Sequence, residues 1–67
     1  MSLDDTISFE EAIVAYRTIT GACAAGTRVF IENRFGRPHK ESYSIREIIV
    51  LTKGEYRSEV FAKFFEK

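Results

Sequence analysis

Apolar side chains recur with a helical period in the first third of this chain. Intervals of three and four residues separate Phe9, Ala12, Ile13 and Tyr16. This spacing places them on one face of an α-helix, and Gly21 stands where a glycine commonly ends a helix. The pattern predicts a helix from about Phe9 to Thr18 or Ile19.

Two helix starts carry the same four-residue signal. Ser8 and Ser44 are each followed three positions later by a glutamate, Glu11 and Glu47 respectively. In such a capping box the serine hydroxyl accepts from the glutamate backbone N–H, and the glutamate carboxylate accepts from the serine N–H. The second box predicts a helix that begins at Ile45. Its apolar residues include Ile48, Ile49 and Leu51.

Two further helices are expected. Residues 22–35 favour a helix over a strand, because five residues share a broad helical face: Cys23, Thr27, Phe30, Ile31 and Arg34. Gly36 and Pro38 then stop it, and residues 36–42 form a polar loop. Gly54 marks a turn before the last helix, over residues 55–66. That helix carries the apolar side chains of Tyr56, Val60, Phe61, Phe64 and Phe65.

The fold class that follows is all-α: a compact bundle of three or four short helices. One domain spans residues 1–67, with residues 1–6 flexible. Six Phe and three Tyr supply large core side chains for a chain near the lower size limit for independent folding. An α+β alternative stays open, because residues 28–31 and 48–50 are β-favouring runs. It would pair residues 28–35 with residues 43–52 as a β-hairpin.

The formal net charge is zero, with ten basic against ten acidic side chains. The charge is unevenly spread, since residues 1–27 are acidic, residues 28–46 are basic and residues 47–67 are balanced. One cysteine excludes a disulfide within the chain, which favours a reducing, cytoplasmic setting. No apolar run approaches the length of a membrane span and no secretory signal is visible, so no membrane association is expected.

Residues 21–27 superficially resemble a phosphate-binding loop. The essential lysine is missing and the preceding element is helical, so we interpret these small residues as a tight helix–helix junction. Cys23 has no base placed to activate it and is expected to be a buried structural residue. His39 is expected to be a solvated loop residue, and one Cys with one His does not make a zinc site. We therefore expect no enzyme activity, cofactor or metal.

Residues 45–65 resemble a helix-turn-helix in outline, with Gly54 as the turn glycine. This suggests an alternative function, a small DNA-binding regulator. Its nucleic-acid contacts would come from Arg34, Arg37, Lys40 and Arg57. Glu55 and Glu59 lie early in the would-be recognition helix and would repel phosphates, and the domain has no net positive charge. Nucleic-acid binding is therefore not the expected function.

The last helix gives the one positive functional indication. Its apolar residues occupy a wider arc than one packing neighbour covers, and an exposed aromatic patch usually marks an interface. We expect a protein-interaction or assembly module whose partner is another protein or a second copy of the chain. The partner-binding residues would be Tyr56, Val60, Phe61, Phe64 and Phe65. Phe61 and Phe64 should be the more buried, and Phe65 the more exposed.

Overall fold

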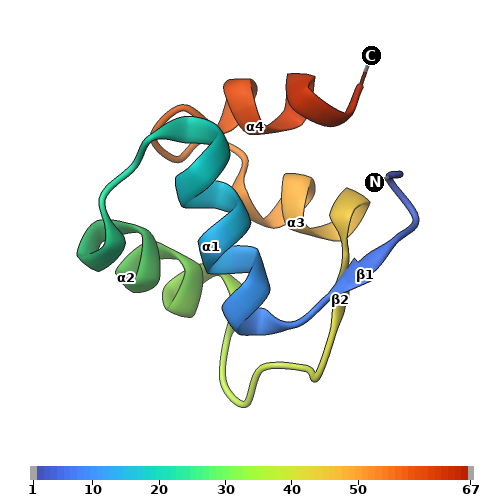
Figure 1. Ribbon diagram of the computed structural model, residues 1–67. Helices are drawn as coiled ribbons and strands as arrows, with labels where there is room; N and C mark the ends of the chain where they lie inside the picture. Colours follow the sequence, from blue (N-terminus) through green and yellow to red (C-terminus); the bar gives the residue numbers. More distant parts are fainter. Residues whose placement is uncertain (1, 67) are drawn as a thin grey trace.

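A computed structural model describes residues 2–66. Its helices are α1 (Phe9–Thr20), α2 (Ala24–Phe35), α3 (Ile45–Thr52) and α4 (Ser58–Phe65). Two short antiparallel strands, β1 (Thr6–Ile7) and β2 (Tyr43–Ser44), set Thr6 opposite Ser44 and Ile7 opposite Tyr43. The expected helical bundle is confirmed, with a minimal sheet added beside it (Figure 1).

The β-hairpin alternative is wrong. Residues 28–35 belong to α2, and residues 45–52 form α3. The burial of α3 explains why it is a helix: Ile45, Ile48 and Thr52 are buried at intervals of three and four residues, while Val50 is exposed. A strand would have buried alternate residues instead. Only residues 43–44 of the supposed second strand are extended, and their partner is β1.

The capping serines act as the sequence predicts at both helices. At α1 the box is complete, since the Glu11 N–H donates to Ser8 Oγ over 3.1 Å and the Ser8 N–H donates to Glu11 Oε1 over 2.8 Å. At α3 the Glu47 N–H donates to Ser44 Oγ over 3.1 Å. The Glu47 carboxylate, however, accepts from Lys40 Nζ at 2.7 Å, so this glutamate forms an ion pair with a loop lysine.

The N-terminal segment supplies two backbone hydrogen-bond acceptors to the start of α3. The Ile45 N–H donates to the carbonyl of Asp5, and the Arg46 N–H donates to the carbonyl of Leu3, each over 2.9 Å. These are two of the four backbone donors that a helix start leaves without helical partners. The flexibility expected for residues 1–6 thus concerns a segment that is hydrogen-bonded from Ser2 onward, and Met1 lies outside the described residues.

The last helix begins three residues later than the sequence predicts. Arg57, the residue before α4, adopts a left-handed conformation with φ 56° and ψ 29°, so residues 55–57 form part of a turn. The four helices are 12, 12, 8 and 8 residues long. No helix within residues 2–66 has the length and apolar character needed to cross a bilayer.

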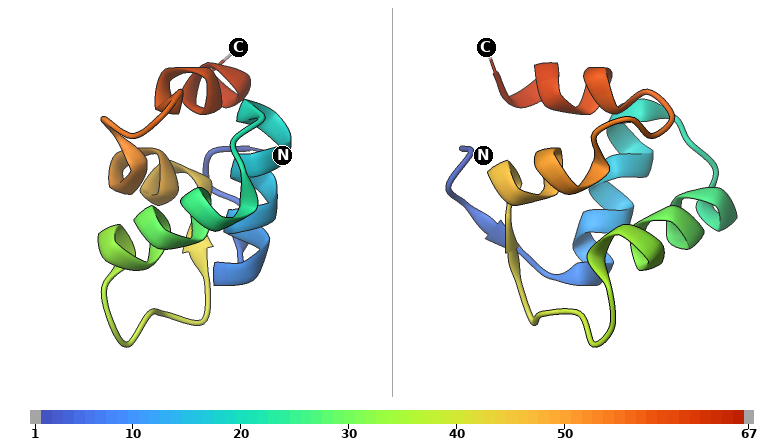
Figure 2. Two further views of the ribbon diagram at one scale, coloured as in Figure 1. Left: turned by 90° about the vertical axis from the view of Figure 1, so that its left-hand side faces the viewer. Right: turned by 180° about the vertical axis from the view of Figure 1, so that it is seen from behind.

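The core lies where the four helices meet. Helix α1 packs mainly against α2 and α4, and α3 packs against the same two helices (Figure 2). Tyr16 of α1 is fully buried at the centre, stacked on Phe61 at 5.1 Å and edge-on to Phe30 at 5.0 Å between ring centroids. The other buried apolar residues are Phe9, Ala12, Ile13, Ile31, Tyr43, Ile45 and Ile48.

Candidate interaction surface

The five apolar residues predicted for a partner surface are not in equivalent places. Phe61 is fully buried in the core, so it is not available to a partner. Phe65 is half-buried, with its ring 5.1 Å from that of Phe61, whereas Phe64 is 52% exposed. Val60 is half-buried and Tyr56 is 64% exposed.

The expected order of burial is therefore wrong for two phenylalanines. We expected Phe64 to be buried and Phe65 to be the more exposed, and the structure shows the reverse. The buried side of α4 follows Phe61 and Phe65, which are four residues apart and so lie one above the other on the helix. Phe64 lies to one side of that line, at the margin of the core.

Tyr56 lies in the turn between α3 and α4, and its backbone is hydrogen-bonded to a core residue. The buried Tyr16 hydroxyl donates a hydrogen bond to the backbone carbonyl of Tyr56. Burial raises the pKa of Tyr16 to about 12, with a further contribution from the carboxylates of Glu55 and Glu59. Tyr16 therefore stays protonated at neutral pH and keeps this bond. Because the bond uses the backbone of Tyr56, the phenol ring of Tyr56 is left to project from the surface.

Tyr56 borders a wide apolar groove along the first half of α2. The groove has a volume of about 820 Å³. Two of its residues are exposed large hydrophobic side chains, Val29 at 59% and Tyr56 at 64%. Ala22, Ala25 and Phe30 add further apolar surface. Adjoining exposed apolar side chains in a groove are a feature that binding sites share.

The small residues around the start of α2 border this groove. Ala24, Ala25 and Gly26 are exposed, so the tight helix–helix junction predicted for residues 21–27 is wrong. The connection from α1 to α2 is short, since only residues 21–23 separate the two helices. The small side chains leave the N-terminal end of α2 open to the solvent.

One buried hydroxyl, that of Thr27, has no hydrogen-bond partner among the described residues. Thr27 lines the groove and is 1% exposed, and its Oγ1 is the one buried side-chain polar atom among residues 2–66 that lacks a partner. The other two buried threonines behave differently. Thr20 donates to the carbonyl of Tyr16 over 2.7 Å, and Thr52 donates to the carbonyl of Ile48 over 2.9 Å. Each of those two bonds reaches the carbonyl four residues back.

Cys23 also lines the groove, and the prediction that it is buried is wrong. The residue is exposed as the N-cap of α2, where its Sγ accepts from the Gly26 N–H over 3.4 Å. A capping side chain folds back over the first turn of its helix, and here that turn lies at the surface. Sequence periodicity placed Cys23 on the same face as Ile31 and gave no sign that the helix starts only after it.

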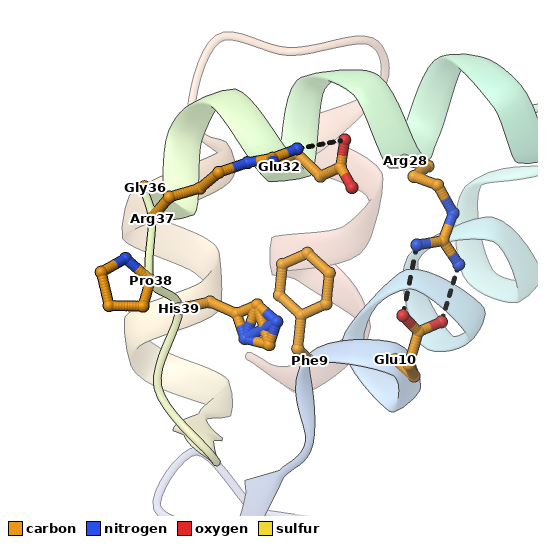
Figure 3. A pocket seen from close by; sticks show the side chains of 8 residues that line it. All are labelled: Phe9, Glu10, Arg28, Glu32, Gly36, Arg37, Pro38 and His39. Carbon is orange, nitrogen blue, oxygen red and sulfur yellow. Dashed lines mark hydrogen bonds and ion pairs between the residues drawn. The ribbon is translucent and has the colours of Figure 1, made fainter.

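A second, smaller pocket of about 340 Å³ lies between the start of α1 and the loop after α2 (Figure 3). There His39 is exposed, as expected, but its ring stacks on Phe9 with 4.0 Å between centroids and 5° between planes. Arg28 makes a bidentate pair with Glu10, at 2.7 and 3.2 Å, and this hydrogen bonding lowers the pKa of Glu10. The charged groups of this pocket thus bind one another.

The cations proposed for DNA contacts are mostly neutralised. Arg34 pairs with Glu55 at 2.7 Å, Arg37 with Glu32 at 3.4 Å, and Lys40 with Glu47 at 2.7 Å. Arg57 alone of the four makes no ion pair within residues 2–66. The basic middle segment also pairs with the acidic first segment, through Arg28–Glu10 and Arg46–Asp4.

Within residues 2–66, no three His, Cys, Asp or Glu side chains come together in a group that could hold a metal ion. Comparison of the chain with protein-family models, with curated proteins and with solved structures gives no match.

Proposed function

We propose that this domain is a cytoplasmic, non-catalytic protein-interaction module that binds its partner in the groove beside α2. The observation that carries the proposal is the joining of two exposed hydrophobic side chains, Val29 and Tyr56, in one groove. This moves the contact surface predicted from the sequence. Of the five residues predicted, Tyr56 belongs to the proposed surface, where Val29 and Phe30 join it. Phe61 is part of the core.

The hydrogen bond from Tyr16 to the backbone of Tyr56 favours binding. Tyrosine is enriched among the residues that contribute most to protein interfaces, because it offers a large contact area with little side-chain entropy to lose. The Tyr16 hydrogen bond holds the Tyr56 backbone in place before any partner arrives. A preformed anchor lowers the entropic cost of association.

DNA binding is the weaker candidate. Nonspecific affinity for DNA comes from cations that replace the counterions of the phosphates. Three of the four proposed contact residues are already engaged by carboxylates, and only Arg57 is left to meet a phosphate. Breaking those pairs would reduce the electrostatic gain that binding depends on.

Site-specific photo-crosslinking in cells tests the proposal. A benzoylphenylalanine is placed at position 29 in the groove or, as a matched control, at position 14 on α1. The valines at these positions are 59% and 57% exposed, and Val14 lies outside the groove. We expect a discrete protein adduct from position 29 and none of that mass from position 14.

The captured protein, or a second copy of the chain if the adduct has twice its mass, must then bind the purified domain. Tyr56→Ser should weaken that binding at least about tenfold, the effect of losing an interface anchor. The fold should persist, because only the backbone of Tyr56 is bonded to Tyr16. Equal adducts from both positions, no adduct from position 29, or full binding by Tyr56→Ser would refute the proposal.

A further inference from the structure

A second groove lies between α3 and α4, which pack against each other (Figure 1). Its volume is about 480 Å³, and it shares no lining residue with the groove beside α2. Six of the residues that line this α3–α4 groove come from two rows, one at each helix: Ile49, Val50, Lys53, Glu59, Ala62 and Glu66.

The α3–α4 groove carries both a projecting and a small apolar side chain. Val50 is 67% exposed, the largest exposed fraction among the large hydrophobic side chains of residues 2–66. Glu59, Ala62 and Glu66 follow one another at intervals of four or fewer residues, so they share one face of α4. The methyl group of Ala62 in the middle of that row leaves room for a larger apolar side chain to pack there.

The same groove carries both signs of charge. Lys53 stands on the side of α3, and Glu59 and Glu66 stand on the side of α4, and all three are exposed. None of the three makes an ion pair within residues 2–66, whereas five other basic side chains of the domain are paired with carboxylates. Unpaired charges around an apolar contact select a partner with the complementary pattern of charge.

These properties make the α3–α4 groove complementary to itself. A two-fold dimer requires such a surface, because the same patch of both molecules meets across the axis. A partner with charge of one sign fits less well, since a basic segment would meet Lys53 and an acidic segment would meet Glu59 and Glu66. Charge complementarity therefore favours a second copy of this chain.

We infer that α3 and α4 form the interface of a two-fold homodimer. Val50 of each copy packs against Ala62 of the other, and Lys53 of each copy pairs with Glu59 or Glu66 of the other. This dimer goes beyond the proposed function, because it leaves the groove beside α2 open on both copies.

The size of the surface sets the expected strength of the dimer. Each of the two helices has eight residues and is therefore about 12 Å long. An interface built on two such short helices is small, and small interfaces belong to weak, reversible complexes. We expect a dissociation constant in the micromolar range.

Sedimentation equilibrium of the purified domain, from micromolar to millimolar concentration, measures the dimer. Val50→Ser should weaken dimerisation at least about tenfold, because it removes the projecting apolar side chain. Val14→Ser is the matched control, since Val14 is a similarly exposed helical valine outside the α3–α4 groove, and it should leave dimerisation unchanged.

Charge reversal tests which residues meet. Lys53→Glu makes the groove uniformly acidic, and Glu59→Lys combined with Glu66→Lys makes it uniformly basic, so each variant alone should dimerise at least about tenfold more weakly. A one-to-one mixture of the two variants should regain association, because an acidic groove then faces a basic one. Lys63→Glu changes the net charge as Lys53→Glu does but lies outside the groove, and it should leave dimerisation unchanged.

Three results would overturn the inference. They are a wild type that stays monomeric at millimolar concentration, a dimer that Val50→Ser and both charge variants leave intact, and a mixture of the two charge variants that does not associate. A dimer that only Tyr56→Ser weakens would place the contact in the groove beside α2 and would equally overturn it. Crosslinking at position 29 does not depend on the α3–α4 groove, so failure of the dimer and failure of the proposed function are distinguishable.

Discussion

Replacing Thr27 with valine should stabilise this domain, although Thr27 is buried in the first turn of α2. Valine has nearly the same shape and is also β-branched, so packing and helix propensity change little. Thr27 is 1% exposed, and the substitution removes a hydroxyl that has no hydrogen-bond partner among the described residues. An unpaired buried hydroxyl costs about 1–3 kcal/mol, so we expect a gain of about 1 kcal/mol in the free energy of unfolding.

Thr52→Val is the matched control, because Thr52 is fully buried and its hydroxyl is paired with the carbonyl of Ile48. Removing a paired hydroxyl loses a net of about 0.5–1.5 kcal/mol. The two substitutions are chemically identical, so the sign of their effects should differ only because one hydroxyl is bonded and the other is not.

Thermal unfolding followed by circular dichroism measures both. A change of 1 kcal/mol shifts the Tm of a domain of this size by about 4–8 °C. The Tm of Thr27→Val should rise by about that amount, and that of Thr52→Val should fall. If Thr27→Val lowers the Tm as much as Thr52→Val does, the Thr27 hydroxyl has a hydrogen-bond partner in solution, and the reasoning is refuted.

Four further predictions concern single groups. Ser44→Ala should destabilise the domain by about 1 kcal/mol in urea unfolding, the usual cost of losing an N-cap, and an unchanged midpoint would contradict the cap. Arg57→Gly should stabilise by roughly 0.5–1 kcal/mol by relieving the left-handed backbone, whereas Arg57→Ala should not; equal effects would exclude strain. Cys23 should react with a thiol reagent in the native state at a rate close to that in denaturant, and strong native protection would contradict its exposure. The pKa of Tyr16 is raised from 10.0 to about 12, so the stability that its protonated hydroxyl contributes is complete below pH 10 and is lost as the pH rises toward 12. Tyr16→Phe should therefore flatten the dependence of unfolding free energy on pH between pH 10 and 12. An unchanged slope would show that other groups cause this dependence.

Local signals in the sequence determined most of the secondary structure. The serines at positions 8 and 44 start their helices as predicted, and Gly21 and Gly36 end theirs with φ of 78° at each. These signals work because caps and glycine turns depend on a few neighbouring atoms. The start of α4 was missed because a left-handed Arg57 has no local signature, and packing of the turn against Tyr16 holds it there.

Tertiary structure decided what is exposed, and therefore where the candidate site lies. Periodicity put Phe64 and Phe65 on the same broad arc, and only the position of the core around Phe61 selected Phe65 for burial. The acidic first segment and the basic middle segment are separate in the sequence but meet in the fold, where Arg28 forms an ion pair with Glu10. The groove joins residues of α2 to Tyr56, more than twenty positions later in the chain, and no sequence pattern reports a contact at that separation. Sequence period determines which face of each helix is apolar, whereas packing between helices decides which apolar side chains are left uncovered.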